Sequence, residues 1–402
     1  MTATPTPSTP TLLQWQEDDE SRQARWRSER GAAPAQRVLL ADDTLAADEA
    51  SRLANAGTAL LWRGDFQNAR LLMQAMQRRA DRPPRRKTRS VGTEPAPPPV
   101  AKAEVPGAAF HRHRLAQSQR ARLLGQILIE VGGDYSIALR RAPDWRLACT
   151  EAWGEPDGEP SVVSLRELLG VLSAHEWRKK GVPIPALGPA PDNRIHAHYG
   201  VFSPLRGEYL DLVAAGPLPA GALELAFDIG TGSGVIAALL ARRGVARVIA
   251  TDMDARALAC AADNLQRLGL SDRVELLAAD LFPPGRAALV VCNPPWLPAR
   301  PGSALERAIY DEDGAMLKGF LNGLAQHVLP QGEGWLILSD LAERLGLRES
   351  GELASLIAAA GLQVLGRSDI WPRHPKASDV EDPLHEARSR EVTTLWRLGV
   401  IE

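Results

Sequence analysis

The chain has 402 residues, of which 45% are hydrophobic and 24% charged, and its net charge is −2 at pH 7. This length predicts two or three domains with cores of their own, and the charge balance excludes a protein that is basic or acidic as a whole. We expect a cytoplasmic protein, because the N-terminus lacks a basic leader with an apolar stretch and no run of about 18 apolar residues could span a membrane. Cys149, Cys260 and Cys292 show no metal-ligand spacing, so we expect buried free thiols and no metal site.

The N-terminal half predicts an accessory domain preceded by a tail. Residues 1–43 are rich in Thr, Pro, Gln and charged side chains, which indicates a flexible N-terminal tail. Residues 44–185 are expected to form a mainly helical accessory or substrate domain, most clearly at 65–79, where apolar residues recur at helical spacing. Residues 83–106 contain seven prolines and predict an extended linker within this domain.

A basic segment lies around that linker. Residues 78–89 contain seven basic side chains and one acid, and H-R-H-R at 111–114 continues the bias. A segment of this kind, 78–122, could contact the phosphates of a nucleic acid, or it could be a solvated linker. The sequence leaves both interpretations open.

From residue 223 onward the sequence alternates between apolar strands and helices that end on glycine. Continuous apolar strands separated by helices predict a parallel sheet covered on both faces, so we expect a Rossmann-like, doubly wound α/β domain over 223–402, with 186–222 as a connecting segment. The seven expected strands are 223–228, 245–252, 273–280, 287–292, 334–340, 363–367 and 392–398.

Polar residues end the first four of these strands. In a parallel sheet, ligands bind at the carboxyl ends of the strands, so these residues are candidates for one site. They are Asp228, Asp252, Asp280 and Asn293. The first strand is followed by a turn with Gly230, Gly232 and Gly234, where backbone can approach a ligand closely. Asp252 suits the two hydroxyls of a ribose.

A glycine-rich turn with a downstream acid is also typical of nicotinamide sites. Those sites need G-x-G-x-x-G, whereas this chain has G-x-G-x-G at 230–234. The spacing therefore disfavours a nicotinamide oxidoreductase.

Four motifs in order, D-I-G-T-G-S-G, A-T-D-M-D, A-A-D-L-F and V-C-N-P-P-W, resemble the class I S-adenosylmethionine-dependent methyltransferases. N-P-P followed by an aromatic residue narrows the resemblance to enzymes that methylate planar nitrogen. These are the HemK/PrmC-type protein glutamine N5-methyltransferases and the amino methyltransferases of nucleic acids. The resemblance covers residues 195 to 340 well, and the N-terminal half has no match in it.

The resemblance implies a role for each motif. The methionine end of S-adenosylmethionine would lie against Asp228 and the turn, and the ribose against Asp252 with Met253 beside the adenine. Asp280 and the Leu281 N–H would meet the adenine amino group. The acceptor nitrogen would meet the N-P-P-W motif. The cofactor-binding turn comprises Gly230, Thr231, Gly232 and Gly234, and the catalytic motif comprises Asn293, Pro294, Pro295 and Trp296.

The N-P-P-W motif suits an acceptor nitrogen whose lone pair is delocalised. The Asn293 side-chain oxygen and the Pro294 carbonyl can each accept one N–H, which turns the lone pair toward the methyl group. The proline rings fix φ, so these acceptors stay in place, and Trp296 offers a flat surface for stacking. No general base is required.

The sequence therefore predicts an N-methyltransferase whose acceptor is a protein glutamine or another macromolecule. The stretch A-I-Y-D-E-D-G after N-P-P-W is similar to HemK-type enzymes and favours a protein glutamine. The basic segment favours an RNA or DNA amino group, adenine N6 or guanine N2. A hypothesis of another class is a non-catalytic nucleic-acid- or ribosome-binding protein with this fold.

Overall fold

The computed structural model describes residues 11–82, 105–373 and 377–401. The chain divides into two compact units, Met1–Leu172 and Ser173–Glu402. The Pro-rich linker predicted at 83–106 lies outside the described residues except for its last two positions.

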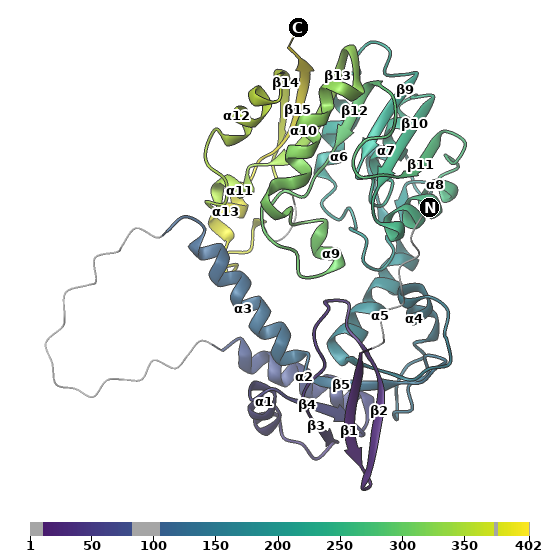
Figure 1. Ribbon diagram of the computed structural model, residues 1–402, viewed down its shortest axis with the longest axis vertical. Helices are drawn as coiled ribbons and strands as arrows, with labels where there is room; N and C mark the ends of the chain where they lie inside the picture. The colour runs from purple at the N-terminus through teal and green to yellow at the C-terminus, as the bar shows by residue number, and fades with distance from the viewer. Residues whose placement is uncertain (1–10, 83–104, 374–376, 402) are drawn as a thin grey trace, which may run out of the picture. The chain divides into compact units, whose positions relative to one another are not determined.

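Unit 1 is built on a six-stranded mixed sheet with the order β1-β2-β6-β5-β4-β3 (Figure 1). Its strands are β1 (Leu12–Glu17), β2 (Glu20–Arg27), β3 (Arg37–Ala41), β4 (Thr58–Trp62), β5 (Ile127–Val131) and β6 (Ser161–Ser164). Its helices are α1 (Ala47–Asn55), α2 (Phe66–Ala80), α3 (Ala108–Leu124), α4 (Arg146–Trp153) and α5 (Leu165–Lys180), whose last turns belong to unit 2.

The structure places strands in two parts of this half of the chain where the sequence predicted none. Residues 12–41 of the expected tail form three strands, and the Asp18–Asp19 turn that joins the first two has positive φ at both residues. The expected mainly helical domain contains three further strands of this sheet, of which β4 and β5 are mostly apolar runs of five residues each. Runs this short cannot be told from buried helix segments by periodicity, because short buried strands and short buried helix segments are both mostly apolar.

Unit 2 contains a seven-stranded sheet with the order β11-β10-β9-β12-β13-β15-β14 (Figure 1). Strand β15 runs antiparallel to β13 and β14, and the other neighbouring strands pair in parallel. The strands are β9 (Leu225–Ile229), β10 (Arg247–Asp252), β11 (Val274–Ala278), β12 (Ala287–Cys292), β13 (Val328–Ser339), β14 (Leu362–Ile370) and β15 (Thr393–Val400). The predicted doubly wound α/β sheet of seven strands is confirmed.

Helices cover both faces of this sheet because its strands are apolar on both sides. Alternate residues of β12 and β13 point into two separate cores, one under α6 (Glu208–Ala215) and α7 (Val235–Arg242), the other under α10 (Ala315–His327) and α12 (Glu352–Ala359). The first core also receives Leu265 and Leu268 from α8 and the turn after it. The remaining elements are α8 (Ala255–Arg267), α9 (Ala304–Arg307), α11 (Leu341–Arg344), α13 (His385–Ser389) and η2 (Glu312–Gly314).

The segment 186–222, expected to be a connection, contains α6 as well as part of a small hairpin. That hairpin pairs β7 (Val182–Pro183) with β8 (Arg194–Ile195), and η1 (Pro185–Leu187) lies between them. Across the described ranges, no helix combines the length and the apolar character needed to cross a membrane. Cys149, Cys260 and Cys292 are buried free thiols, as expected.

Candidate functional site

The four polar strand ends meet at the same edge of the unit 2 sheet. Strands β11, β10, β9 and β12 are neighbours in that order and run parallel, so their carboxyl ends lie side by side. Asp228 on β9 lies opposite Ala250 on one side and Val291 on the other, which places it at the centre of this edge. This is where open α/β sheets bind ligands.

Asp228 is a fully buried carboxylate with one oxygen held by the turn that follows it. Its Oδ2 accepts the hydroxyl of Thr231 at 2.6 Å and the backbone N–H of Ala237 at 3.0 Å. Its Oδ1 is buried and has no hydrogen-bond partner among the described residues. Burial raises the pKa of the Asp228 carboxyl to about 7, although the two hydrogen bonds lower it. A cationic group beside Oδ1 would relieve this penalty.

The glycine turn after β9 needs glycine for different reasons at each position. Gly230, Gly232 and Gly234 all have positive φ, +71°, +54° and +79°. A Cβ at Gly230 would collide with Met316, and one at Gly234 would meet Ala261 at 3.0 Å. A Cβ at Gly232 would meet nothing within 4 Å. The turn is therefore packed at its two ends and open at its middle.

Asp252 ties the glycine turn to the next strand. Its Oδ2 accepts the Gly232 N–H at 3.0 Å, and its Oδ1 accepts the Asp254 N–H at 2.9 Å. Asp254 in turn caps α8, because its side chain accepts the Arg256 N–H. Met253, between the two acids, has a side chain that is 80% exposed.

The end of β11 turns back over β10. Asp280 is exposed, and Leu281 adopts a φ of +69°, which is rare for a side chain of this kind. The Thr251 hydroxyl donates to the Leu281 carbonyl, and the Thr251 carbonyl accepts the Thr231 N–H at 2.8 Å. The ends of β9, β10 and β11 are thus joined through one buried threonine.

The N-P-P-W motif begins immediately after β12. Asn293 and Trp296 are half-buried, Pro294 is buried, and the indole N–H of Trp296 donates to Asn293 Oδ1 at 2.9 Å. The segment 310–311 supports the motif at its C-terminal end. Leu297 forms a bridge with Tyr310, and Asp311 caps α10. The Asp311 carboxylate accepts the N–H groups of Met316 and Leu317 at 3.0 and 3.1 Å.

Sequence reasoning missed two residues that support the site. Asn264 is fully buried on α8; it accepts the His196 N–H at 2.7 Å and donates to the Ser233 carbonyl at 3.0 Å. It lies on the buried face of α8 that includes Ala257 and Cys260. A polar residue at an otherwise apolar helical spacing indicates a buried hydrogen-bonding role, and this pattern could have identified Asn264 from the sequence. Asp311 lies in A-I-Y-D-E-D-G, but its capping role depends on contacts that no spacing rule predicts.

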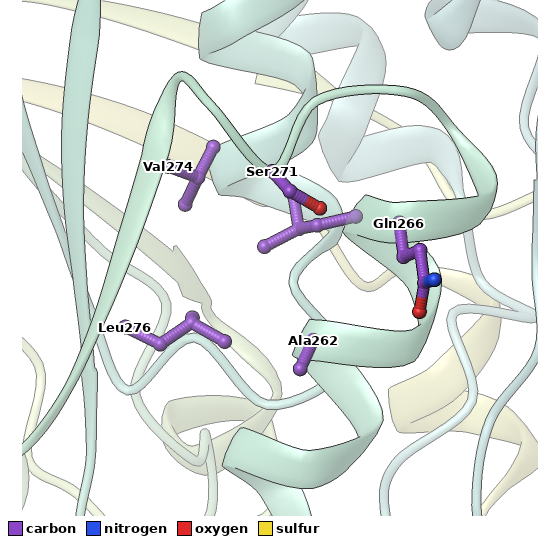
Figure 2. A pocket seen from close by; sticks show the side chains of 6 residues that line it. Ala262, Gln266, Ser271, Val274 and Leu276 are labelled. Carbon is purple, nitrogen blue, oxygen red and sulfur yellow. The ribbon is translucent and has the colours of Figure 1, made fainter.

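The strand ends fit a cationic nucleoside cofactor. The unpartnered buried Oδ1 of Asp228 offers an acceptor to a positive group, and the open side of Gly232 leaves room for a ligand against backbone. A hollow of roughly 530 Å³ lies elsewhere, between the second half of α8 and the first half of β11 (Figure 2). Its walls include Leu265, Val274 and Leu276, so it is no part of this edge. In the described part of the chain, no cluster of three or more His, Cys, Asp or Glu could hold a metal.

The strand order and the strand-end site together define the class I methyltransferase fold, with its single antiparallel strand β15 between β13 and β14. Residues 192–336 match the family model of the methyltransferase small domain. The resemblance of this domain to HemK/PrmC-type S-adenosylmethionine-dependent methyltransferases is confirmed.

Curated relatives include several release factor glutamine methyltransferases. That of Cereibacter sphaeroides is 36% identical over 149 residues, which is 34% of this chain and 51% of the relative. That of Thermosynechococcus vestitus is 31% identical over 45% of this chain and 62% of the relative. A ribosomal protein uL3 glutamine methyltransferase of Bordetella pertussis is 36% identical over 28% of this chain and 40% of the relative. The chain spans about half the length of the curated relatives it matches.

Among solved structures, a ribosomal protein L11 methylase of Lactobacillus delbrueckii subsp. bulgaricus is 17% identical with a TM-score of 0.35. The alignment covers 54% of this chain and 90% of the methylase.

Proposed function

We propose that this protein transfers a methyl group from S-adenosylmethionine to the side-chain amide nitrogen of a glutamine in a protein. The observation that carries this proposal is the position of Asn293 and Pro294 directly after β12, beside the strand ends of Asp228 and Asp252. Relatives named as glutamine methyltransferases support the choice of acceptor.

The chain's own residues supply positioning rather than acid–base chemistry. The Asn293 side-chain oxygen and the Pro294 carbonyl each accept one N–H of the acceptor amide, which weakens the conjugation of its lone pair and directs it at the methyl carbon. When bound, S-adenosylmethionine supplies a methyl group on a positively charged sulfur. The acceptor nitrogen forms the new N–C bond as the C–S bond breaks and its electron pair returns to sulfur. The acceptor nitrogen then loses one proton to water.

Asp228 acts at the other end of the site. Its buried Oδ1 accepts from the ammonium group of the cofactor, and Asp252 accepts from the ribose hydroxyls while it holds the Gly232 N–H in place. Met253, which follows Asp252 in the chain and is exposed, would contact the adenine. Asp280 and the Leu281 N–H meet the adenine amino group.

A second candidate acceptor is an amino group of RNA, and α3 favours it. No acidic residue occurs between residues 105 and 129, while α3 carries Arg112, Arg114, Arg120 and Arg122. Only Phe110 and Leu124 of this helix are buried within unit 1, and its other residues are half-buried or exposed. Such a surface attracts phosphates. The remainder of the proposed nucleic-acid segment 78–122 includes residues 83–104, which lie outside the described residues. The cytoplasmic location stays a prediction.

Tritiated S-adenosylmethionine and a cell extract distinguish the two acceptors. Label that protease releases and nuclease leaves intact supports a protein acceptor, whereas the reverse pattern supports RNA. Tight cofactor binding without label in any macromolecule would instead support a non-catalytic protein with this fold.

A further inference from the structure

The indole of Trp296 contacts the side chain of Asn293, the residue that accepts an N–H of the methyl acceptor in the proposed reaction. The indole N–H lies 2.9 Å from Asn293 Oδ1. An indole N–H can donate a hydrogen bond but cannot accept one, so the atom that faces it must be the amide oxygen and not the amide nitrogen. This contact therefore decides which way round the Asn293 amide is held, because the oxygen and NH₂ ends of an amide have nearly the same shape.

The indole is itself held in place. Trp296 is half-buried and packs against both cores of unit 2, the one under α6 and α7 and the one under α10 and α12. The bridge between Leu297 and Tyr310 fixes the backbone on its C-terminal side. A donor anchored in this way can orient a neighbouring group without being displaced by it.

The orientation of the amide matters because its two ends have opposite hydrogen-bonding character. The oxygen can accept an N–H from the acceptor amide, whereas the NH₂ group of a flipped Asn293 would point two donors at it. A carbonyl oxygen has two lone pairs, so Oδ1 can accept from Trp296 and from the acceptor together. A flipped amide would lose both bonds.

We propose that Trp296 is a positioning residue whose indole N–H locks the Asn293 amide with its oxygen toward the acceptor nitrogen. This inference rests on the proposed function and adds a role that stacking alone would not require. Any aromatic ring can stack on a planar amide. Phenylalanine has no donor, and the hydroxyl of tyrosine lies at the far end of its ring, so neither supplies a donor from the position of the indole nitrogen.

The test replaces the N–H without removing the ring. Trp296 is exchanged for β-(3-benzothienyl)alanine, in which sulfur takes the place of the indole N–H, and Trp296→Phe serves as a second variant. Trp26→Phe is the matched control, since the Trp26 indole also donates a hydrogen bond, to the Ala32 carbonyl at 2.6 Å in unit 1. A recombinant bacterial release factor is the acceptor, and cofactor affinity is measured by calorimetry.

We expect both Trp296 replacements to lower kcat about tenfold, because one oriented hydrogen bond is worth about that much. The KM for the release factor and the cofactor affinity should change less than about threefold, and Trp26→Phe should leave kcat unchanged. A benzothienyl variant with a kcat within twofold of wild type overturns the inference, since its ring still stacks.

A measurement on the protein alone separates this inference from the proposed function. If the wild type does not methylate the release factor, the choice of acceptor fails. The hydrogen bond from Trp296 to Asn293 can still be tested by hydrogen exchange of the Trp296 indole N–H in ¹⁵N spectra. If this hydrogen bond holds, the Trp296 indole N–H should exchange more slowly than the indole N–H of Trp177, which is 47% exposed. It should exchange faster in Asn293→Ala than in the wild type. Exchange as fast as that of Trp177 overturns the inference.

Discussion

Cofactor binding should depend on pH through Asp228. Burial raises the pKa of this carboxyl to about 7, so at pH 6 roughly nine-tenths of the free protein carries it protonated. A cationic cofactor favours the ionised carboxylate, so binding at pH 6 must expel that proton. We expect the affinity for S-adenosylmethionine to rise about tenfold between pH 6 and pH 7.5 and then to level off.

The raised pKa of Asp228 also makes the free energy of unfolding of the cofactor-free protein depend on pH. The pKa of an aspartate is 3.8 when it is not perturbed and about 7 here, so between these values the unfolded chain is ionised while the folded chain is protonated. The unfolded state then binds fewer protons, and the free energy of unfolding falls as pH rises through this window. The difference in pKa corresponds to a fall of about 4 kcal/mol, which Asp228→Asn should remove.

Calorimetry tests both statements. Titration of S-adenosylmethionine at pH 6 in two buffers of different ionisation enthalpy should reveal release of about one proton per cofactor bound, and none at pH 8. Asp228→Asn should abolish the release. An affinity that does not vary between pH 6 and pH 7.5, with no proton released, would refute the assignment of a buried, unpartnered carboxylate to the cofactor site.

Three further variants test separate parts of the site. Gly232→Ala should weaken cofactor binding at least tenfold in calorimetry, because its Cβ enters the open side of the turn. The control Gly31→Ala, with a similar positive φ and nothing within 4 Å, should cost only about 1 kcal/mol of stability. Equal cofactor affinity in both variants would count against the turn as a binding surface. Asn293→Ala should abolish methyl transfer and leave cofactor affinity within a few-fold, and parallel loss of both would make Asn293 a scaffold residue. Asn264→Leu should lower the free energy of unfolding by about 3 kcal/mol in denaturant titrations, since the His196 N–H and the Ser233 carbonyl lose their partner; a change below about 1 kcal/mol would contradict that role.

The fold of unit 2 could be predicted from the sequence because its signals are local and repeated. Strand β12 is a continuous apolar run and β9 is apolar apart from Asp228, and Gly244 and Gly269 follow the helices after β9 and β10. Unit 1 lacks such signals. In β1 only Leu13 and Trp15 are buried, so its sequence looks like a polar tail until β2 pairs with it.

The sequence also predicts one part of the candidate site and not the other. The strand-end residues could be named because position at the end of an apolar strand is a local property. The contacts of Asn264 and the bond between Trp296 and Asn293 depend on how distant segments pack, or on a side-chain rotamer. Spacing in the sequence carries no information about either.

The position of the methyl group on the acceptor tests the central claim most directly. Purified protein, S-adenosylmethionine and a release factor are incubated, and the modified peptide is mapped by mass spectrometry. The proposed geometry, with oxygen acceptors on Asn293 and Pro294, predicts a single methyl group on a glutamine amide nitrogen and none with Asn293→Ala. A methyl group on a carboxylate oxygen or on carbon would contradict it, because neither atom brings two N–H groups to those acceptors.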